Sequence, residues 1–164
     1  MKKNAIKTLF LSFVAVFSLF LLAACGSSTK KGYFQYIDKT SMRDSRITVT
    51  YQGDKVTTNE TTNIVYYESS GMTKEDVKEQ TDSYANLLKG IKGVSYKVEY
   101  KNDYAQEKLS IDFSKANIKE LQSKNLIETS GNQEADYISY KETQKLLKNT
   151  GYSEVKDGKF ENLE

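Results

Sequence analysis

The most regular pattern of hydrophobic and polar residues lies between positions 94 and 113. Apolar or aromatic side chains occupy every second position of its first half, at Val94, Tyr96, Val98 and Tyr100. After an Asn102-Asp103 turn the same spacing returns at Leu109, Ile111 and Phe113. An alternation of period two predicts strands that are buried on one face only. The pattern therefore predicts an antiparallel hairpin with one face covered by other elements.

A second hairpin is predicted closer to the N-terminus. Residues 33–37 form a candidate first strand, and residues 47–51 alternate Ile, Val and Tyr with threonine. Gly53-Asp54 then provides a turn, and residues 56–67 return as a strand rich in Thr, Val, Ile and Tyr. We therefore expect a long hairpin between residues 47 and 67.

Two amphipathic helices with N-terminal capping signals lie outside these hairpins. Thr73 and Asp76 have the spacing of a capping box, and one helical face then carries Val77, Thr81, Tyr84 and Leu88. The second box joins Ser139 to Glu142 and begins a helix that carries Leu146 and Leu147. Gly90 and Gly151 end the two helices.

Shorter elements complete the predicted domain. Ser114 is a candidate cap for a short helix that contains Ile118 and Leu121, and residues 152–155 form a candidate last strand. The acidic C-terminal end is expected to fray. Together these elements predict an α+β fold, in which helices pack on one face of an antiparallel sheet of hairpins in a two-layer sandwich.

The N-terminal end follows a different pattern. Three lysines precede an apolar run over residues 9–24, which ends in Leu22-Ala23-Ala24-Cys25 and contains the only cysteine of the chain. This end resembles the signal peptide and lipobox of bacterial lipoproteins. The resemblance implies cleavage between Ala24 and Cys25 and a diacylglyceryl group on the Cys25 sulfur. The alternative is an uncleaved transmembrane anchor, because about 17 apolar residues reach the short limit for a span.

These observations divide the chain into three parts and give it a location. Residues 1–24 are a lipoprotein signal peptide, residues 25–32 a lipidated flexible tether, and residues 33–164 a single α+β domain. Lipid on Cys25 places the protein on the extracytoplasmic face of the cell membrane. Both the lipoprotein and the transmembrane alternative tether the domain outside the cytoplasm.

Net charge and composition limit the kinds of partner and of catalytic or metal site that the sequence supports. The leader removes three of the 24 basic residues, which leaves 21 against 22 acidic residues and a formal charge of −1. A near-neutral domain argues against nucleic acid as a partner. The chain has no His, and lipid occupies its one Cys. We therefore predict no catalytic residues, no metal site and no cofactor.

Several segments of the mature chain resemble a known family. The segments are the residue runs 51–56, 89–94, 96–100, 111–113 and 146–152. Together they are similar to the YehR-like lipoproteins, a domain-of-unknown-function family. The resemblance spans nearly all of the mature chain and implies a two-layer α+β domain on a lipid anchor. The resemblance assigns no catalytic or binding role to any residue of this chain.

The sequence leaves more than one function open. The first interpretation is a non-catalytic lipoprotein that binds an envelope protein or a cell-wall component. The alternative is a small envelope hydrolase that uses carboxylates or a Ser/Lys pair, which a cleft with two facing acids would favour. A solute-binding lipoprotein is a third idea, although the 140 residues of the mature chain are few for the usual two lobes.

Tyr66 and Tyr67 form the candidate contact patch. Neighbouring residues on a strand point to opposite faces, so one of the two tyrosines must be exposed.

Overall fold

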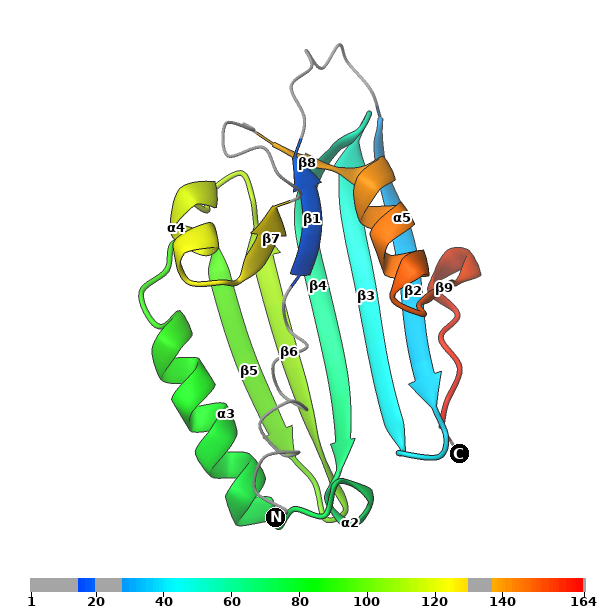
Figure 1. Ribbon diagram of the computed structural model, residues 1–164, viewed down its shortest axis with the longest axis vertical. Coiled ribbons are helices and arrows are strands. Elements are labelled where there is room, and N and C mark those ends of the chain that lie inside the picture. The colour runs from blue at the N-terminus through cyan, green and yellow to red at the C-terminus, as the bar shows by residue number, and fades with distance from the viewer. Residues whose placement is uncertain (1–14, 20–27, 130–136, 164) are drawn as a thin grey trace.

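The main feature of the computed structural model is an antiparallel sheet with helices on one face (Figure 1). The structure describes residues 15–19, 28–129 and 137–163. The strands of the sheet follow the order β5-β6-β4-β3-β2-β9. Their bounds are Thr29–Asp38 for β2, Arg43–Gln52 for β3, Lys55–Tyr66 for β4, Val94–Tyr100 for β5, Tyr104–Asp112 for β6 and Ser153–Glu154 for β9. The predicted α+β class is thus confirmed.

The hairpins follow from the alternating pattern and from their turns. β3 and β4 pair from Arg43↔Val65 to Gln52↔Lys55, and Gly53 adopts a positive φ of 61° in the two-residue turn between them. Glycine takes this left-handed conformation without the steric cost that a Cβ would bring. β5 and β6 pair as the predicted hairpin, from Val94↔Ile111 to Tyr100↔Ala105, and β6 ends at Asp112, one residue before the predicted Phe113. The alternation fixes this register, because a slip by one residue would turn the apolar face outward.

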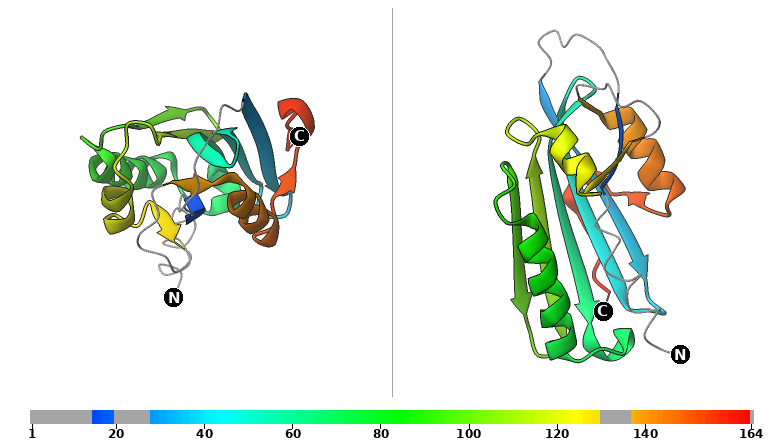
Figure 2. Two further views of the ribbon diagram at one scale, coloured as in Figure 1. Left: turned by 90° about the horizontal axis from the view of Figure 1, so that it is seen from above. Right: turned by 60° about the vertical axis from the view of Figure 1, so that its left-hand side comes forward.

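Helices α3 (Lys74–Leu88), α4 (Ile118–Ser123) and α5 (Tyr140–Asn149) lie on the same face of the sheet (Figures 1 and 2). The predicted capping box of α3 is present, with the Thr73 side chain on the Asp76 N–H and the Asp76 side chain on the Thr73 N–H. α4 is capped by Asn117, whereas the Ser114 hydroxyl bonds to Asp112. The short α2 (Tyr67–Ser70) turns the chain at the end of β4.

The core lies between the helices and the sheet. Phe34, Val49 and Ile111 of the sheet are fully buried together with Leu121 of α4. Tyr84 of α3 meets Tyr96 of β5 edge to face, with their ring centroids 5.2 Å apart. The Thr81 and Tyr100 hydroxyls, also from α3 and β5, are 2.6 Å apart. The predicted packing of the tyrosine face of β5 on α3 is therefore present.

A branch of the same sheet contains part of the predicted leader. Strand β1 (Ala15–Leu19) lies between β7 (Ile127–Thr129), to which it is parallel, and β8 (Ile138–Ser139), to which it is antiparallel. The tether boundary also differs from the prediction, since residues 29–32 are already the first residues of β2. They pair with β3 from Thr29↔Gln52 to Gly32↔Val49, and this pairing removes the freedom expected of a tether.

The C-terminal segment packs on the sheet face that the helices leave open. After the short helix η2 (Lys156–Gly158), the Glu161 N–H donates to the Gln35 side chain, which donates back to the Glu161 carbonyl. The Arg46 guanidinium donates to the same carbonyl, and its carbon lies 5.6 Å from the centroid of the Phe160 ring. The expectation that this end frays is wrong up to Leu163, which is 9% exposed.

Candidate functional site

A row of side chains crosses the helix-covered face of the sheet near the end at which α2 lies. Register places the five residues of the row beside one another, one on each strand: Tyr36, Ser45, Asn63, Glu107 and Val98. Directly opposed residues of antiparallel strands have Cβ atoms about 5 Å apart. Three of the five, Ser45, Asn63 and Glu107, are polar on a face where the neighbouring rows carry Ile47 and Leu109.

Glu107 is the most unusual member of this row. Its side chain is 0% exposed, and neither carboxyl oxygen has a hydrogen-bond partner of good geometry. Burial raises the pKa of Glu107 to about 8 from an ordinary 4.5, while interaction with the Tyr96 hydroxyl opposes this rise. Burial also raises the pKa of Tyr84 and of Tyr96, and the nearby Glu107 charge raises both further. At neutral pH the carboxyl therefore keeps its proton.

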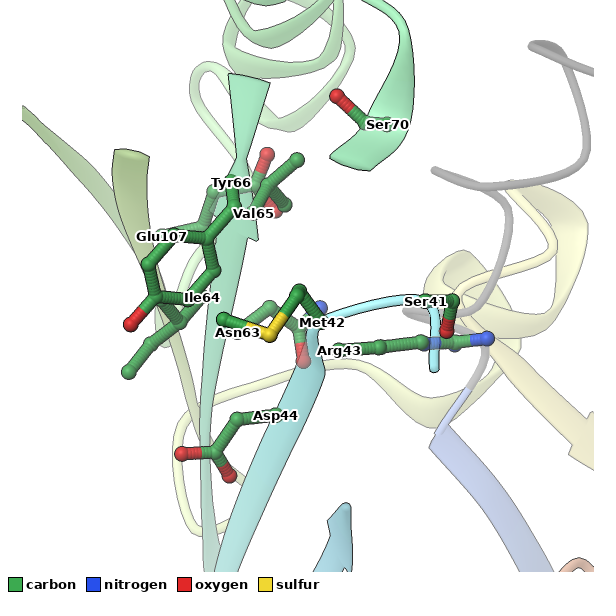
Figure 3. Close-up of a pocket in the computed structure, with 10 residues that line it drawn as sticks. All are labelled: Ser41, Met42, Arg43, Asp44, Asn63, Ile64, Val65, Tyr66, Ser70 and Glu107. Carbon is green, nitrogen blue, oxygen red and sulfur yellow. The ribbon is translucent and has the colours of Figure 1, made fainter. Parts of the chain in front are cut away.

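Glu107 lines a pocket at one end of the sheet. The pocket lies where β3, β4, β6 and α2 meet, and its lining consists of Ser41, Met42, Arg43, Asp44, Asn63, Ile64, Val65, Tyr66, Ser70 and Glu107 (Figure 3). Its volume is about 30 Å³. A space of this size holds about two water molecules, so the pocket can receive one small polar group.

The remaining polar groups of the row are connected to one another. The Ser45 hydroxyl donates to the Asn63 side-chain oxygen at 2.6 Å and lies 2.8 Å from the Tyr152 hydroxyl. Tyr152 in turn packs against Tyr36, with ring centroids 5.8 Å apart. This network fixes the side chain of Asn63 beside Glu107. The polar groups next to the buried acid are thus held in place before any ligand arrives.

The pocket has a second acid, but that acid is engaged elsewhere. Asp44 accepts from the Gln35 side chain at 2.9 Å and forms an ion pair with Arg46 at 2.6 Å. Alternation along β3 places Asp44 on the face opposite Ser45, and Figure 3 shows the Asp44 and Arg43 side chains extending in different directions. The carboxyl groups of Asp44 and Glu107 therefore do not face each other.

The residues predicted as sites have different positions in the structure. Cys25, the predicted lipidation site, lies outside the described residues. Tyr67 is 8% exposed and begins α2, so it is not the strand neighbour of Tyr66 that the sequence predicts. Tyr66 is half-buried at the end of β4, lines the pocket, and has its ring centroid 5.3 Å from that of Tyr104.

Sequence reasoning missed Glu107, although a signal was present. Leu109 and Ile111 define the buried face of β6, and counting back in steps of two places Glu107 and Ala105 on that same face. The predicted strand included only residues from Lys108 onward. A charged residue at a position whose period demands burial was the available clue.

The described part of the chain has neither a cluster of metal-ligating side chains nor a membrane-spanning helix. Residues 15–19, 28–129 and 137–163 contain no group of three or more His, Cys, Asp or Glu side chains that could hold a metal ion. Over the same ranges no helix is long and apolar enough to cross a membrane. Glu75 and Asp76, two adjacent acids, lie in the first turn of α3.

Known proteins resemble this chain over most of its length. The profile of the family described as "Protein of unknown function (DUF1307)" matches residues 33–153. The uncharacterized lipoprotein Lmo0207 of Listeria monocytogenes is 33% identical over 94% of this chain and 97% of its own length. The uncharacterized lipoprotein YehR of Escherichia coli is 31% identical over 93% of this chain and 99% of its own length.

Solved structures agree with these relatives. The NMR structure of E. coli YehR has a TM-score of 0.66 at 29% identity, over 81% of this chain and 95% of the solved chain. A protein from Streptococcus pneumoniae has a TM-score of 0.52 at 11% identity, over 83% and 90% of the two chains, and shares the fold alone. The chain therefore belongs to the DUF1307 family of YehR-like lipoproteins, and its lipoprotein relatives imply a lipid anchor in a membrane.

Proposed function

We propose that this chain is a binding lipoprotein, anchored through lipid on Cys25 to the extracytoplasmic face of the cell membrane. Its domain binds a small polar group of an envelope component in the Glu107 pocket and breaks no bond in it. The observation that carries this proposal is the fully buried Glu107 carboxyl, which lines the pocket without a well-formed hydrogen bond.

The anchor is supported from two directions. Leu22-Ala23-Ala24-Cys25 places small residues before the only cysteine of the chain, after a cationic start and an apolar run. The relatives Lmo0207 of Listeria monocytogenes and YehR of E. coli are uncharacterized lipoproteins and match at least 93% of this chain. A single acyl chain binds membranes only marginally, so the two chains of a diacylglyceryl group are what make such an anchor durable.

Physical chemistry supports binding at Glu107. An unpartnered buried polar group costs about 1–3 kcal/mol, and native proteins keep few of them. A ligand that supplies the missing hydrogen bonds recovers this free energy on binding. Because the carboxyl is protonated at neutral pH, it both donates and accepts, as the Asn63 amide beside it does. Together they fit a neutral group that also has a donor and an acceptor, such as an amide or a hydroxyl.

The hydrolase alternative has one observation in its favour and one against it. A protonated buried carboxyl such as Glu107 is suited to act as a general acid. Hydrolysis by carboxylates needs a second acid that faces the first, and Asp44, the other acid of the pocket, is paired with Arg46 and Gln35 on the opposite face. Binding without catalysis is the function better supported by this geometry.

Photo-crosslinking in native membranes tests the proposal. A photoreactive amino acid at Ser41, on the rim of the pocket, is expected to give a discrete adduct with an envelope component. The same group at Lys119 on α4, away from the pocket, serves as the matched control. Glu107→Leu, which removes both hydrogen-bonding oxygens, is expected to abolish the Ser41 adduct.

Two results would contradict the proposal. Equal adducts from Ser41 and Lys119 would mean that the pocket is not the contact. A crosslinked component recovered as a cleaved fragment, with cleavage lost in Glu107→Gln, would favour the hydrolase. Circular dichroism of each variant confirms that a lost adduct does not reflect an unfolded domain.

A further inference from the structure

A strand from the predicted leader lies between strands β7 and β8. Residues 15–17 of β1 pair in parallel with residues 127–129 of β7, from Ala15↔Ile127 to Phe17↔Thr129. Ser18 and Leu19 pair antiparallel with Ser139 and Ile138 of β8. α5 also packs against β1, which therefore lies in a slot with strands on both edges and a helix beside it (Figure 1).

Removal of the leader would open this slot. The backbone N–H and C=O groups of β7 and β8 that bond to β1 would lose their partners. Apolar residues around the slot are buried in the presence of β1, with Ile127 3%, Ile138 1% and Leu147 6% exposed. Cleavage before Cys25 would thus leave two unpaired strand edges next to an apolar floor. Such a surface takes up an extended peptide through strand addition.

We propose that the mature domain binds, in this slot, an extended and mainly apolar peptide segment of a partner protein. The inference rests on the leader cleavage in the proposed function, but it concerns a different surface from the Glu107 pocket. The segment would run parallel to β7 and antiparallel to β8, as Ala15–Leu19 does in the full chain. Its central residues would be uncharged, like the Ala-Val-Phe-Ser-Leu sequence of β1.

The slot differs from the open edge of the sheet at β5. Among the described strands β5 pairs only with β6, so its outer edge is also available. That strand is protected by exposed charged residues, since Lys97, Glu99 and Lys101 lie on or next to it. Charged side chains, lysine above all, discourage the addition of another strand. The β7 and β8 edges instead adjoin Ile127 and Ile138, which favours an apolar segment there.

A labelled peptide tests the proposal. The probe is Ala-Val-Phe-Ser-Leu flanked by two lysines on each side and carrying a fluorescent label. It is titrated into a protein that has the length of the mature chain, residues 25–164 with Cys25→Ser. We expect this protein to fold because YehR, which matches 81% of this chain, adopts the same fold. We expect saturable binding, with slower amide hydrogen exchange at residues 127–129 and 138–139. The full chain with Cys25→Ser, which keeps β1, is expected to bind at least tenfold more weakly.

A proline control separates strand pairing from general hydrophobic adhesion. Proline in place of Val and Ser of the probe removes two backbone N–H donors, and binding should fall at least tenfold. Equal binding of both peptides, or protection confined to residues 94–100, would overturn the proposal. Protection of residues 127–129 by dimerisation without peptide would also overturn it, because a second copy would then fill the slot.

N-terminal mass analysis of the protein from cells tests cleavage separately. Retention of the leader would refute the proposed function and leave the peptide result intact.

Discussion

Replacement of Glu107 by Gln should change how the stability of the domain depends on pH. Glutamine has the shape of the protonated acid but cannot ionise. In the wild type the folded-state pKa is about 8, whereas the unfolded chain has an ordinary value of 4.5. Between these two values the unfolded state has lost the proton that the folded state retains. Stability from Glu107 is therefore complete below the lower pKa and is lost as pH rises through the upper one.

The size of the effect follows from the two pKa values. Each pH unit between them lowers the free energy of unfolding by about 1.4 kcal/mol. Relative to acid conditions, the wild type should lose about 3 kcal/mol by pH 7 and about 4 kcal/mol by pH 8 through this residue. The Glu107→Gln variant should not show this loss. The difference between the two proteins should grow with pH, and the variant should be the more stable at neutral pH.

Urea unfolding measured from pH 4.5 to pH 8.5 checks this prediction. Other titrating groups contribute equally to both proteins and cancel in the difference. Glu60→Gln is the matched control, because Glu60 is exposed on β4 and its variant should follow the wild-type profile. Parallel profiles for Glu107→Gln and the wild type would refute the reasoning. That result would mean that the Glu107 carboxyl is solvated or ionised in the folded state.

Three further predictions concern other parts of the molecule. Tyr67→Ala should lower the free energy of unfolding by about 3 kcal/mol or more, as core truncations do. Tyr66→Ala should lower it by only about 1 kcal/mol, because the Tyr66 side chain is half-buried. Equal losses of the two variants in urea unfolding would contradict this prediction. Thr73→Ala removes the cap of α3 and should cost about 1 kcal/mol, whereas exposed Ser95→Ala should stay within about 0.5 kcal/mol. Chelator should leave the melting temperature unchanged, and a drop reversed by calcium would reveal a metal site.

Much of the fold was predictable because its local signals agree with its tertiary packing. The alternation in β5 and β6, the Gly53-Asp54 turn and the Thr73 capping box each specify a structure within a few residues. The packing of Tyr96 and Tyr100 on α3 followed from two faces of matching spacing. In these segments local preference and the final environment require the same conformation.

The structure differs from the sequence prediction where contacts with distant residues determine the local conformation. The C-terminal end was expected to fray, but Gln35 and Arg46, more than 100 positions away, bind the Glu161 backbone. Residues 29–32 read as a tether because they are small and polar, yet pairing with β3 makes them a strand. Tyr67 read as a strand residue, but α2 begins there. No local pattern identifies these partners.

The candidate site was the least predictable part. Its pocket depends on four elements meeting at one end of the sheet, and only Glu107 carried a periodicity signal. The tyrosine patch was predicted from strand alternation, and of the two residues Tyr66 lies at the pocket while Tyr67 is in the core. Buried acids escape pattern analysis because such analysis assigns charged residues to the solvent side.

The lipid anchor is the claim on which the proposed function depends, and fatty-acid labelling tests it most directly. Cells that express the wild type or Cys25→Ser are grown with labelled palmitate, and the protein is then purified and its N-terminus identified by mass. The wild type is expected to begin at Cys25 and to carry label, while Cys25→Ser keeps its leader and takes up none. Equal labelling of the two proteins, or a wild type that retains residues 1–24, would contradict the account.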